Sequence, residues 1–182
     1  MRAERRKVRP AVLWFTGLPG SGKTTLARGV SAHLRRRGLP VEELDGDGIR
    51  ALFPDTGFSR QDRDLHLRRV GHLAGTLEKH GVFVVASFVS PFADTRRSVR
   101  LLCSKFIEIH VTAPLEVCER RDPKGLYARA RRGELKDFTG VDSPYEAPES
   151  PELAVDTARL TPAEALAEVL AYVDERLLSG SA

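Results

Sequence analysis

Gly17-Leu18-Pro19-Gly20-Ser21-Gly22-Lys23-Thr24 is the stretch of sequence that decides the fold of this chain. An apolar run at residues 11–15 precedes it, as expected for a buried strand, and residues 23–36 after it have the character of a helix. Between a strand and a helix, the pattern G-x-x-x-x-G-K-[ST] is a phosphate-binding loop. The alternative is a glycine-rich turn that binds nothing. It does not explain why Lys23 and Thr24 both stand at the positions that the pattern requires. We therefore predict that a nucleoside triphosphate binds here.

The chemistry of this loop assigns a role to each of its parts. Glycines let the backbone approach a bound anion, so that successive N–H groups point at it, and the helix that follows adds its positive end. Lys23 is predicted to be catalytic and to reach the β- and γ-phosphates, while the Thr24 hydroxyl holds Mg²⁺. The residues predicted to bind the triphosphate are Gly17, Leu18, Pro19, Gly20, Ser21, Gly22, Lys23, Thr24 and Thr25.

Outward from the loop, strand-like and helix-like segments alternate to the end of the chain. Further strands are predicted at residues 41–44, 82–88, 106–111 and 153–157, and further helices at 49–53, 59–80, from 90, 114–121, 124–132 and from 161. This alternation predicts an α/β fold, a nucleoside-kinase-like parallel sheet of about five strands flanked by helices. We expect a basic N-terminal tail at residues 1–10 and a single domain over residues 11–182.

The composition narrows the range of partners. The chain has 182 residues, of which 41% are hydrophobic and 30% charged, and its longest apolar runs are too short to span a membrane. The net charge of +4 arises from arginines scattered with little aromatic interleaving, which favours small polyanionic substrates over nucleic acid. Cys103 and Cys118 lack metal-binding spacing and are expected to be free thiols buried in helices. We expect a cytoplasmic protein that binds neither membrane nor nucleic acid.

The acidic residues near the expected ligand edge of the sheet follow the second predicted strand. The third predicted strand ends in Phe88-Val89-Ser90, without the Asp that often supports Mg²⁺ in phosphate-loop enzymes. Asp45 and Asp47 follow residues 41–44 instead, a strand that we expect beside the first one. The chain contains no Asn-Lys-x-Asp stretch that recognises guanine, which argues against a GTPase.

Further stretches form a recognisable set with the loop. They are residues 13–16, 44–47 with Arg50, 57–59, 62–63, 90–91, 114–119, 121–122, 124–127, 133–134, 138–142 and 144–148. In this order, over about residues 13–157, they resemble the adenylylsulfate kinase family of phosphate-loop kinases. The loop alone is shared by many enzymes, whereas residues 124–127 and 138–148 are specific to that family.

The resemblance implies an activity, substrates and partners. Similar proteins transfer phosphate from Mg-ATP to the 3′-hydroxyl of adenosine 5′-phosphosulfate in sulfate activation, giving 3′-phosphoadenosine 5′-phosphosulfate and ADP. They are usually homodimers, and with 182 residues and no room for a fused sulfurylase, a separate ATP sulfurylase is expected upstream. Two alternatives stay open: a small-molecule kinase for another nucleotide or sugar hydroxyl, and a nucleotide-sensing module with weak catalysis.

The resemblance also implies roles for individual side chains. Arg50 and Arg63 would grip the phosphosulfate, since a guanidinium makes two charge-assisted bonds to such an anion. Phe58 and Phe138 would sandwich the substrate adenine, with core packing as the alternative for Phe58. Arg121 would lie against the ATP adenine, under a lid at about residues 124–150. The residues expected to bind the phosphosulfate nucleotide are Asp45, Arg50, Phe58, Arg63, His66, Ser90, Lys124, Leu126 and Phe138.

Three residues besides Lys23 are expected to be catalytic. Asp47 is predicted to orient or deprotonate the attacking hydroxyl and to hold Mg²⁺ through water, with Asp45 in support. The family makes Ser90 a phosphoserine intermediate, but a serine before Pro91 is also typical of a helix N-cap. We predict direct transfer, without an enzyme intermediate.

His66 stands where the family normally has asparagine. Positive charge from Arg63 and Arg69 on the same predicted helix should favour the neutral ring, whereas a bound phosphosulfate should favour the protonated ring. Affinity for the phosphosulfate is therefore predicted to weaken as the pH rises past roughly 6.5.

Overall fold

A computed structural model of the chain describes residues 8–53 and 56–178. Its strands are β1 (Val12–Thr16), β2 (Val41–Asp45), β3 (Phe83–Ser87), β4 (Phe106–Thr112) and β5 (Leu153–Asp156). Its helices are α1 (Lys23–Arg36), α2 (Gly46–Leu52), α3 (Arg60–Lys79), α4 (Ala93–Arg100), α5 (Leu115–Arg121), α6 (Leu126–Arg131) and α7 (Pro162–Val173), the last continued by a π-helical turn, η1 (Asp174–Leu178). Within the described ranges, no helix combines the length and the apolar character that a membrane span requires.

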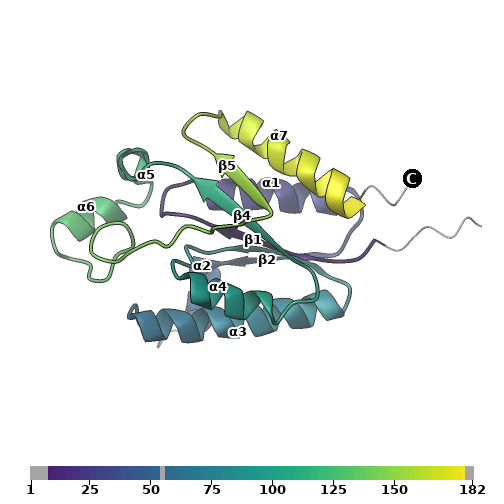
Figure 1. Ribbon diagram of the computed structural model, residues 1–182, viewed down its shortest axis with the longest axis horizontal. Helices are drawn as coiled ribbons and strands as arrows, with labels where there is room; N and C mark the ends of the chain where they lie inside the picture. Colours follow the sequence, from purple (N-terminus) through teal and green to yellow (C-terminus); the bar gives the residue numbers. More distant parts are fainter. Residues whose placement is uncertain (1–7, 54–55, 179–182) are drawn as a thin grey trace, which may run out of the picture.

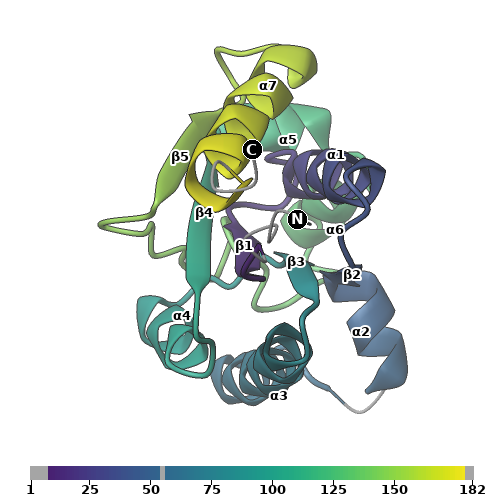
Figure 2. The ribbon, with the colours of Figure 1, turned by 90° about the vertical axis from the view of Figure 1, so that its right-hand side faces the viewer.

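The strands form one parallel sheet in the order β2-β3-β1-β4-β5. Figure 2 shows α1 and α7 on one face of this sheet and α3 and α4 on the other. Figure 1 shows α5 and α6 projecting beyond one end of the layers. The predicted five-stranded α/β fold is confirmed. The expectation that β2 lies beside β1 is wrong, because the chain passes through α2 and α3 and then inserts β3 between them.

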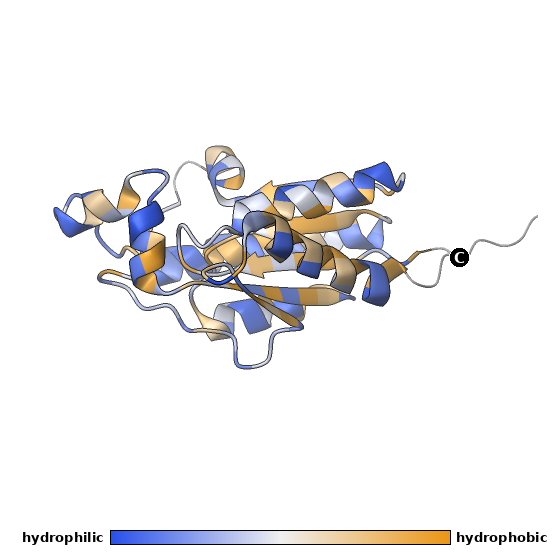
Figure 3. Cartoon of the chain, turned by 90° about the horizontal axis from the view of Figure 1, so that it is seen from above, coloured by the Kyte–Doolittle hydropathy of each residue, from blue (hydrophilic) through white to orange (hydrophobic). Residues whose placement is uncertain are grey.

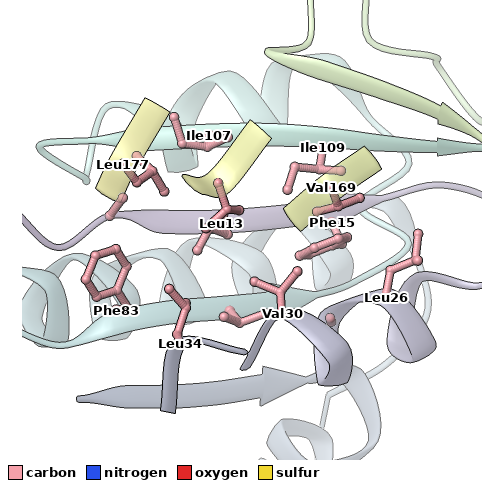
Figure 4. Close-up of a cluster of buried hydrophobic side chains, with 14 of the residues drawn as sticks. Leu13, Phe15, Leu26, Val30, Leu34, Phe83, Ile107, Ile109, Val169 and Leu177 are labelled. Atoms are coloured by element: carbon pink, nitrogen blue, oxygen red, sulfur yellow. The ribbon is translucent and has the colours of Figure 1, made fainter. Parts of the chain in front are cut away.

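Both faces of the central strand β1 are buried, as expected for a parallel sheet covered on two sides. Successive side chains of a strand point to opposite faces, so Leu13 and Phe15 join one apolar cluster, and Val12 and Trp14 join the other. Figure 4 shows the first cluster, in which the β1 residues lie between side chains of α1 and Val169 of α7. In Figure 3 the central strands are largely hydrophobic, while the helices mix both colours.

Two helices begin as their sequences predict. Ser59 accepts a hydrogen bond from the N–H of Asp62, and the Asp62 carboxylate accepts one from the N–H of Ser59, which completes a capping box for α3. Thr161 and Glu164 form the same reciprocal pair at the start of α7. A capping box joins residues that are three positions apart in the sequence, so it can be predicted from the sequence.

Several local predictions are corrected. The helix expected from Ser90 begins later, at Ala93, and α2 begins at Gly46 rather than near Ile49, because Asp45 caps it. Cys103 follows the end of α4 and is half-buried, while Cys118 is buried in α5, and both are free thiols. Residues 1–7 of the predicted tail lie outside the described residues, and Val8 packs against the core.

Candidate active site

The phosphate loop connects β1 to α1 through backbone conformations that suit glycine. Gly17 has a φ of 152°, and a Cβ atom there would lie 2.3 Å from the carbonyl oxygen of Val111. Gly22 precedes α1 with a φ of 100°, in the left-handed region that other residues rarely adopt. These positions let the loop turn tightly and present the N-terminus of a fourteen-residue helix to an anion.

A cavity of about 1160 Å³ opens over this loop. It is lined by nearly all of the residues predicted for the two nucleotides, namely Pro19, Gly20, Gly22, Lys23, Thr24, Thr25, Asp45, Asp47, Arg50, Phe58, Arg63, His66, Ser90, Arg121, Lys124, Leu126 and Phe138. Gly17, Leu18 and Ser21 do not line it. Leu18 borders a smaller cavity of about 240 Å³ instead.

One wall of this cavity was not predicted from the sequence. It is formed by Thr157, Leu160, Pro162 and Ala165. Thr157 links that wall to the loop, because its hydroxyl donates to the carbonyl of Ser21 at 2.8 Å. Arg121 in turn donates to the Thr157 carbonyl at 2.5 Å. No local motif marks Thr157, since its role comes from residues 36 and 136 positions away.

Lys23 lies buried at the base of the cavity. Its Nζ donates to the carbonyl oxygen of Leu18 at 2.8 Å, so the ammonium is held inside the loop. Burial lowers the pKa of Lys23 to about 8, and the nearby charge of Lys124 acts in the same direction. The side chain is therefore a cation at neutral pH, in a place where phosphate oxygens can replace the lost hydration.

Asp45 and Asp47 have different partners in the structure. Asp45 is the N-cap of α2, and its carboxylate accepts from the N–H groups of Asp47 and Gly48 at 2.9 and 2.8 Å. Asp47 is exposed and forms an ion pair with Lys124. Asp45 thus positions the first turn of α2, and Asp47 presents its carboxylate to the cavity.

The two arginines predicted for the phosphosulfate approach Phe58 from different helices. The guanidinium of Arg50 lies 4.3 Å from the centre of the Phe58 ring, and that of Arg63 lies 5.9 Å from it. Burial lowers the pKa of both arginines. Phe58 is 58% exposed, so the alternative of core packing is wrong for this residue.

Arg63 also connects α3 to the segment that the sequence predicts as a lid. It donates to the Phe58 carbonyl at 2.7 Å and to the Thr139 hydroxyl at 2.9 Å, and it contacts the Asp137 carbonyl. Phe138 lies between those two lid residues, with its ring edge-on to Tyr127 at 5.1 Å. Arg63 thus links the backbone at Phe58 to the two lid residues that flank Phe138.

Ser90 occupies a hydrogen-bond network instead of a helix cap. Its hydroxyl accepts from the indole N–H of Trp14 at 3.1 Å and donates to the Thr16 hydroxyl at 2.9 Å. The residue is 2% exposed, and its φ of 39° is far from the extended conformation of an N-cap. The N-cap interpretation is therefore wrong, and neither partner of the hydroxyl is a base.

Replacing Ser90 by alanine should leave turnover within about tenfold of wild type, because its hydroxyl is bonded to Trp14 and Thr16 and the predicted direct transfer would need no enzyme intermediate. The indole N–H of Trp14 loses its acceptor, which should lower the free energy of unfolding by about 1–3 kcal/mol. Denaturant unfolding and steady-state rates measure both effects, with Ser98→Ala, on the outer part of α4, as the control. Phosphate trapped on Ser90 at a kinetically competent rate would contradict this prediction.

His66 lies on α3 with its ring in the wall of the cavity and is 2% exposed. Burial is the main cause that lowers the pKa of His66 to about 4, followed by the charges of Arg50 and Arg69. The prediction of a neutral ring is confirmed in direction, but its cause is corrected, since burial outweighs charge and Arg50 replaces Arg63. The expected pH window near 6.5 does not apply to the ring in the free protein.

Known proteins resemble this chain in sequence and in fold. The sequence model of the family described as Adenylylsulphate kinase matches residues 9–156. An adenylyl-sulfate kinase of Marinobacter nauticus is 48% identical over 97% of this chain and 92% of its own length. One of Geotalea daltonii is 51% identical over 97% of this chain and 89% of its own length.

Solved structures agree with this result. The Mycobacterium tuberculosis APS kinase in complex with AMPPNP and APS superposes with a TM-score of 0.87 and 42% identity, over 91% of this chain and 98% of that one. A hexameric APS kinase from Thiobacillus denitrificans gives a TM-score of 0.71 and 34% identity, over 95% of this chain and 30% of that one. By sequence and by fold, this chain belongs to the adenylylsulphate kinase family.

Proposed function

We propose that this protein transfers the γ-phosphate of ATP to the 3′-hydroxyl of adenosine 5′-phosphosulfate, giving 3′-phosphoadenosine 5′-phosphosulfate and ADP. The observation that carries the proposal is a single cavity that joins the phosphate loop to Arg50, Arg63 and Phe58. Two cations beside an aromatic ring suit an adenine nucleotide with an extended anionic end. Family membership supports the same reaction, and a related structure binds an ATP analogue and APS.

The oxygen donors of the cavity suit Mg²⁺. The Thr24 hydroxyl and the Asp47 carboxylate both line it, and no cluster of three His, Cys, Asp or Glu side chains occurs among residues 8–53 and 56–178. Mg²⁺ prefers one or two protein oxygens together with phosphate oxygens and water, so this sparse set fits it. When bound, the ion would neutralise charge that develops on the transferring phosphate.

The side chains of the chain divide the remaining work. Lys23 neutralises the β- and γ-phosphates, and Asp47 accepts or orients the proton of the attacking 3′-hydroxyl. Arg50 and Arg63 hold the phosphosulfate, which fixes the hydroxyl in line with the phosphate. Phosphoryl transfer needs mainly such positioning and charge stabilisation, so no covalent intermediate is required.

Residues 124–150 are proposed to act as a lid over both nucleotides. Tyr127 of this segment donates to the Pro19 carbonyl of the phosphate loop at 3.0 Å, and Thr139 accepts from Arg63 on α3. The segment thus contacts the residues assigned to each nucleotide. Closing it would exclude water from the reacting groups.

The cellular setting is also a proposal. Free thiols at Cys103 and Cys118 suit the reducing cytoplasm. A separate ATP sulfurylase would supply the phosphosulfate, and a homodimer is expected from the family resemblance.

A panel of acceptors tests the proposed reaction. ADP release from Mg-ATP would be measured with adenosine 5′-phosphosulfate, AMP and shikimate as acceptors. We expect kcat/KM for the phosphosulfate to exceed that for AMP by at least about 10²-fold, because AMP leaves an arginine without its anion. Faster turnover of AMP or shikimate would contradict the assignment and favour a different small-molecule kinase.

A further inference from the structure

Arg96 of α4 is a buried cation that does not line the cavity. Its side chain is 3% exposed, and its Nε donates to the carboxylate of Glu108 on β4 at 2.8 Å. A buried ion pair often contributes no more stability than apolar side chains of similar volume, because both charges lose their hydration. Stability alone therefore does not account for a guanidinium at this position.

The other two nitrogens of Arg96 hold backbone carbonyls of two segments near the site. Nη1 donates to the carbonyl of Ser90 at 2.8 Å, and Nη2 donates to that of Glu146 at 2.7 Å. Ser90 lines the cavity with a φ of 39°, a conformation that a residue other than glycine keeps only when its surroundings fix it. Glu146 belongs to the C-terminal part of the lid, residues 124–150. Arg96 thus joins a wall of the cavity to one end of the lid.

Glu146 completes this junction from the side of the lid. Its N–H donates to the carbonyl of Pro91 at 2.8 Å, and its carboxylate accepts from the N–H of Ala93, the first residue of α4, at 2.7 Å. The preceding residue, Tyr145, places its hydroxyl 3.0 Å from that of Thr16 at the end of β1. The chain is therefore bonded at residues 145–146 to β1, to α4 and to the segment between β3 and α4.

The N-terminal part of the lid contacts the site in a different way. Lys124 forms its ion pair with Asp47 between side chains that are 57% and 78% exposed. Exposed ion pairs contribute little stability, so this contact opens easily, whereas the junction at Arg96 is buried. The lid thus has a firmly held end at Glu146 and a weakly held end at Lys124.

We propose that Arg96 is a positioning residue for phosphoryl transfer, which anchors the C-terminal end of the lid to the Ser90 segment so that the lid closes in one position. The inference rests on the proposed function, because that function makes residues 124–150 a lid over two nucleotides. Arg96 reaches the site through the backbone of Ser90 and Glu146. Without this anchor the lid should close imprecisely, which misplaces the acceptor and admits water.

Replacing Arg96 by methionine tests the anchor through the fate of ATP. We expect kcat to fall about 10- to 100-fold, the usual effect of a small misplacement. The KM for ATP should stay within a few-fold of wild type, because Arg96 does not contact the phosphate loop. The ratio of ADP released to acceptor phosphorylated should rise from about one to about two or more, since water then competes for the phosphate. Arg97→Met, at an exposed position of the same helix, is the matched control and should keep the ratio of wild type.

Glu108→Gln separates the anchor from a purely structural role. Glutamine keeps an oxygen acceptor for Arg96 but removes the charge, so the Tm should fall while the bonds to Ser90 and Glu146 remain. The ratio of ADP to phosphorylated acceptor should therefore stay near that of wild type. A ratio that rises in Glu108→Gln as it does in Arg96→Met, in step with the loss of Tm, would show that Arg96 is only structural, and would overturn the proposal.

Glu146→Ala keeps the proposal testable if Arg96→Met does not fold. This change removes the carboxylate from the N–H of Ala93 at a half-buried position, so the Tm should fall less while the ratio still rises. Glu168→Ala, at an exposed position of α7, is its control. A ratio equal to that of wild type in Glu146→Ala would overturn the proposal.

Hydrogen exchange separates this inference from the proposed function, because it needs no substrate. Without nucleotides, amides of residues 138–146 should exchange about tenfold faster or more in Arg96→Met and Glu146→Ala, and as in wild type in Arg97→Met and Glu108→Gln. If wild type does not phosphorylate the phosphosulfate, the proposed function is wrong, and exchange still tests the anchor. If wild type does phosphorylate it, and both anchor variants keep the exchange, kcat and ratio of wild type, only the inference is wrong.

Discussion

Replacing Asp47 by asparagine is expected to lower kcat by about 10²–10⁴-fold, the usual contribution of a general base. Asparagine keeps the shape of the side chain but cannot accept the proton of the 3′-hydroxyl. The loss should fall on kcat rather than on ATP binding, because in the proposed function Lys23 and the loop amides would hold the triphosphate. The ion pair with Lys124 is exposed, so its loss should change the free energy of unfolding little.

Asp45→Asn provides the matched control for this variant. Asparagine caps helices about as well as aspartate, so α2 should keep its first turn while the same charge is removed. We expect a smaller loss of kcat than for Asp47→Asn. Equal losses would mean that Asp45 and Asp47 act only through the negative charge that they place at the end of β2. Near-normal turnover of Asp47→Asn would remove Asp47 from the mechanism.

Replacing Lys23 by methionine should lower kcat by about 10²–10³-fold, comparable to the loss of one group that stabilises transition-state charge. The KM for ATP should rise as well, since the ammonium is also proposed to bind phosphate before transfer. Methionine is similar in length and suits a buried position, so the fold should persist. Lys79→Met, at the exposed end of α3, is the control for removing a lysine charge.

The pH dependence of ATP binding offers a second test of Lys23. Its pKa of about 8 in the free protein means that the ammonium loses its proton as the pH rises past that value. Bound phosphates favour the charged form and raise this pKa, so ATP affinity should fall above about pH 8, by up to tenfold per unit. Lys23→Met should not show this decline. Identical profiles in both proteins would contradict a phosphate contact.

The elements of the fold were predictable because their signals are local. The loop motif, the apolar runs and the capping boxes each depend on residues a few positions apart, and α1 begins and ends where the sequence predicts. The position of β2 at the edge of the sheet was not predictable in this way. The position depends on which strands pair, and strand pairing is not determined by residues that are close together in the sequence.

In the site as well, features that depend on local motifs were predicted, and features that depend on long-range contacts were not. Lys23, Arg63 and Phe58 were identified from motifs and meet in one cavity. The environment of Ser90 was predicted wrongly, because Trp14 and Thr16 reach it from more than 70 positions away. The burial of His66 was missed for a similar reason, since Phe88 and Arg50 approach it from other elements.

The most direct test of the central claim is the ³¹P NMR spectrum of the product formed from Mg-ATP and adenosine 5′-phosphosulfate. The proposed function predicts ADP and one new phosphomonoester signal coupled to the 3′-proton of the ribose, with the phosphosulfate signal retained. Phosphate at another position, or ATP hydrolysis without a new phosphomonoester, would contradict it.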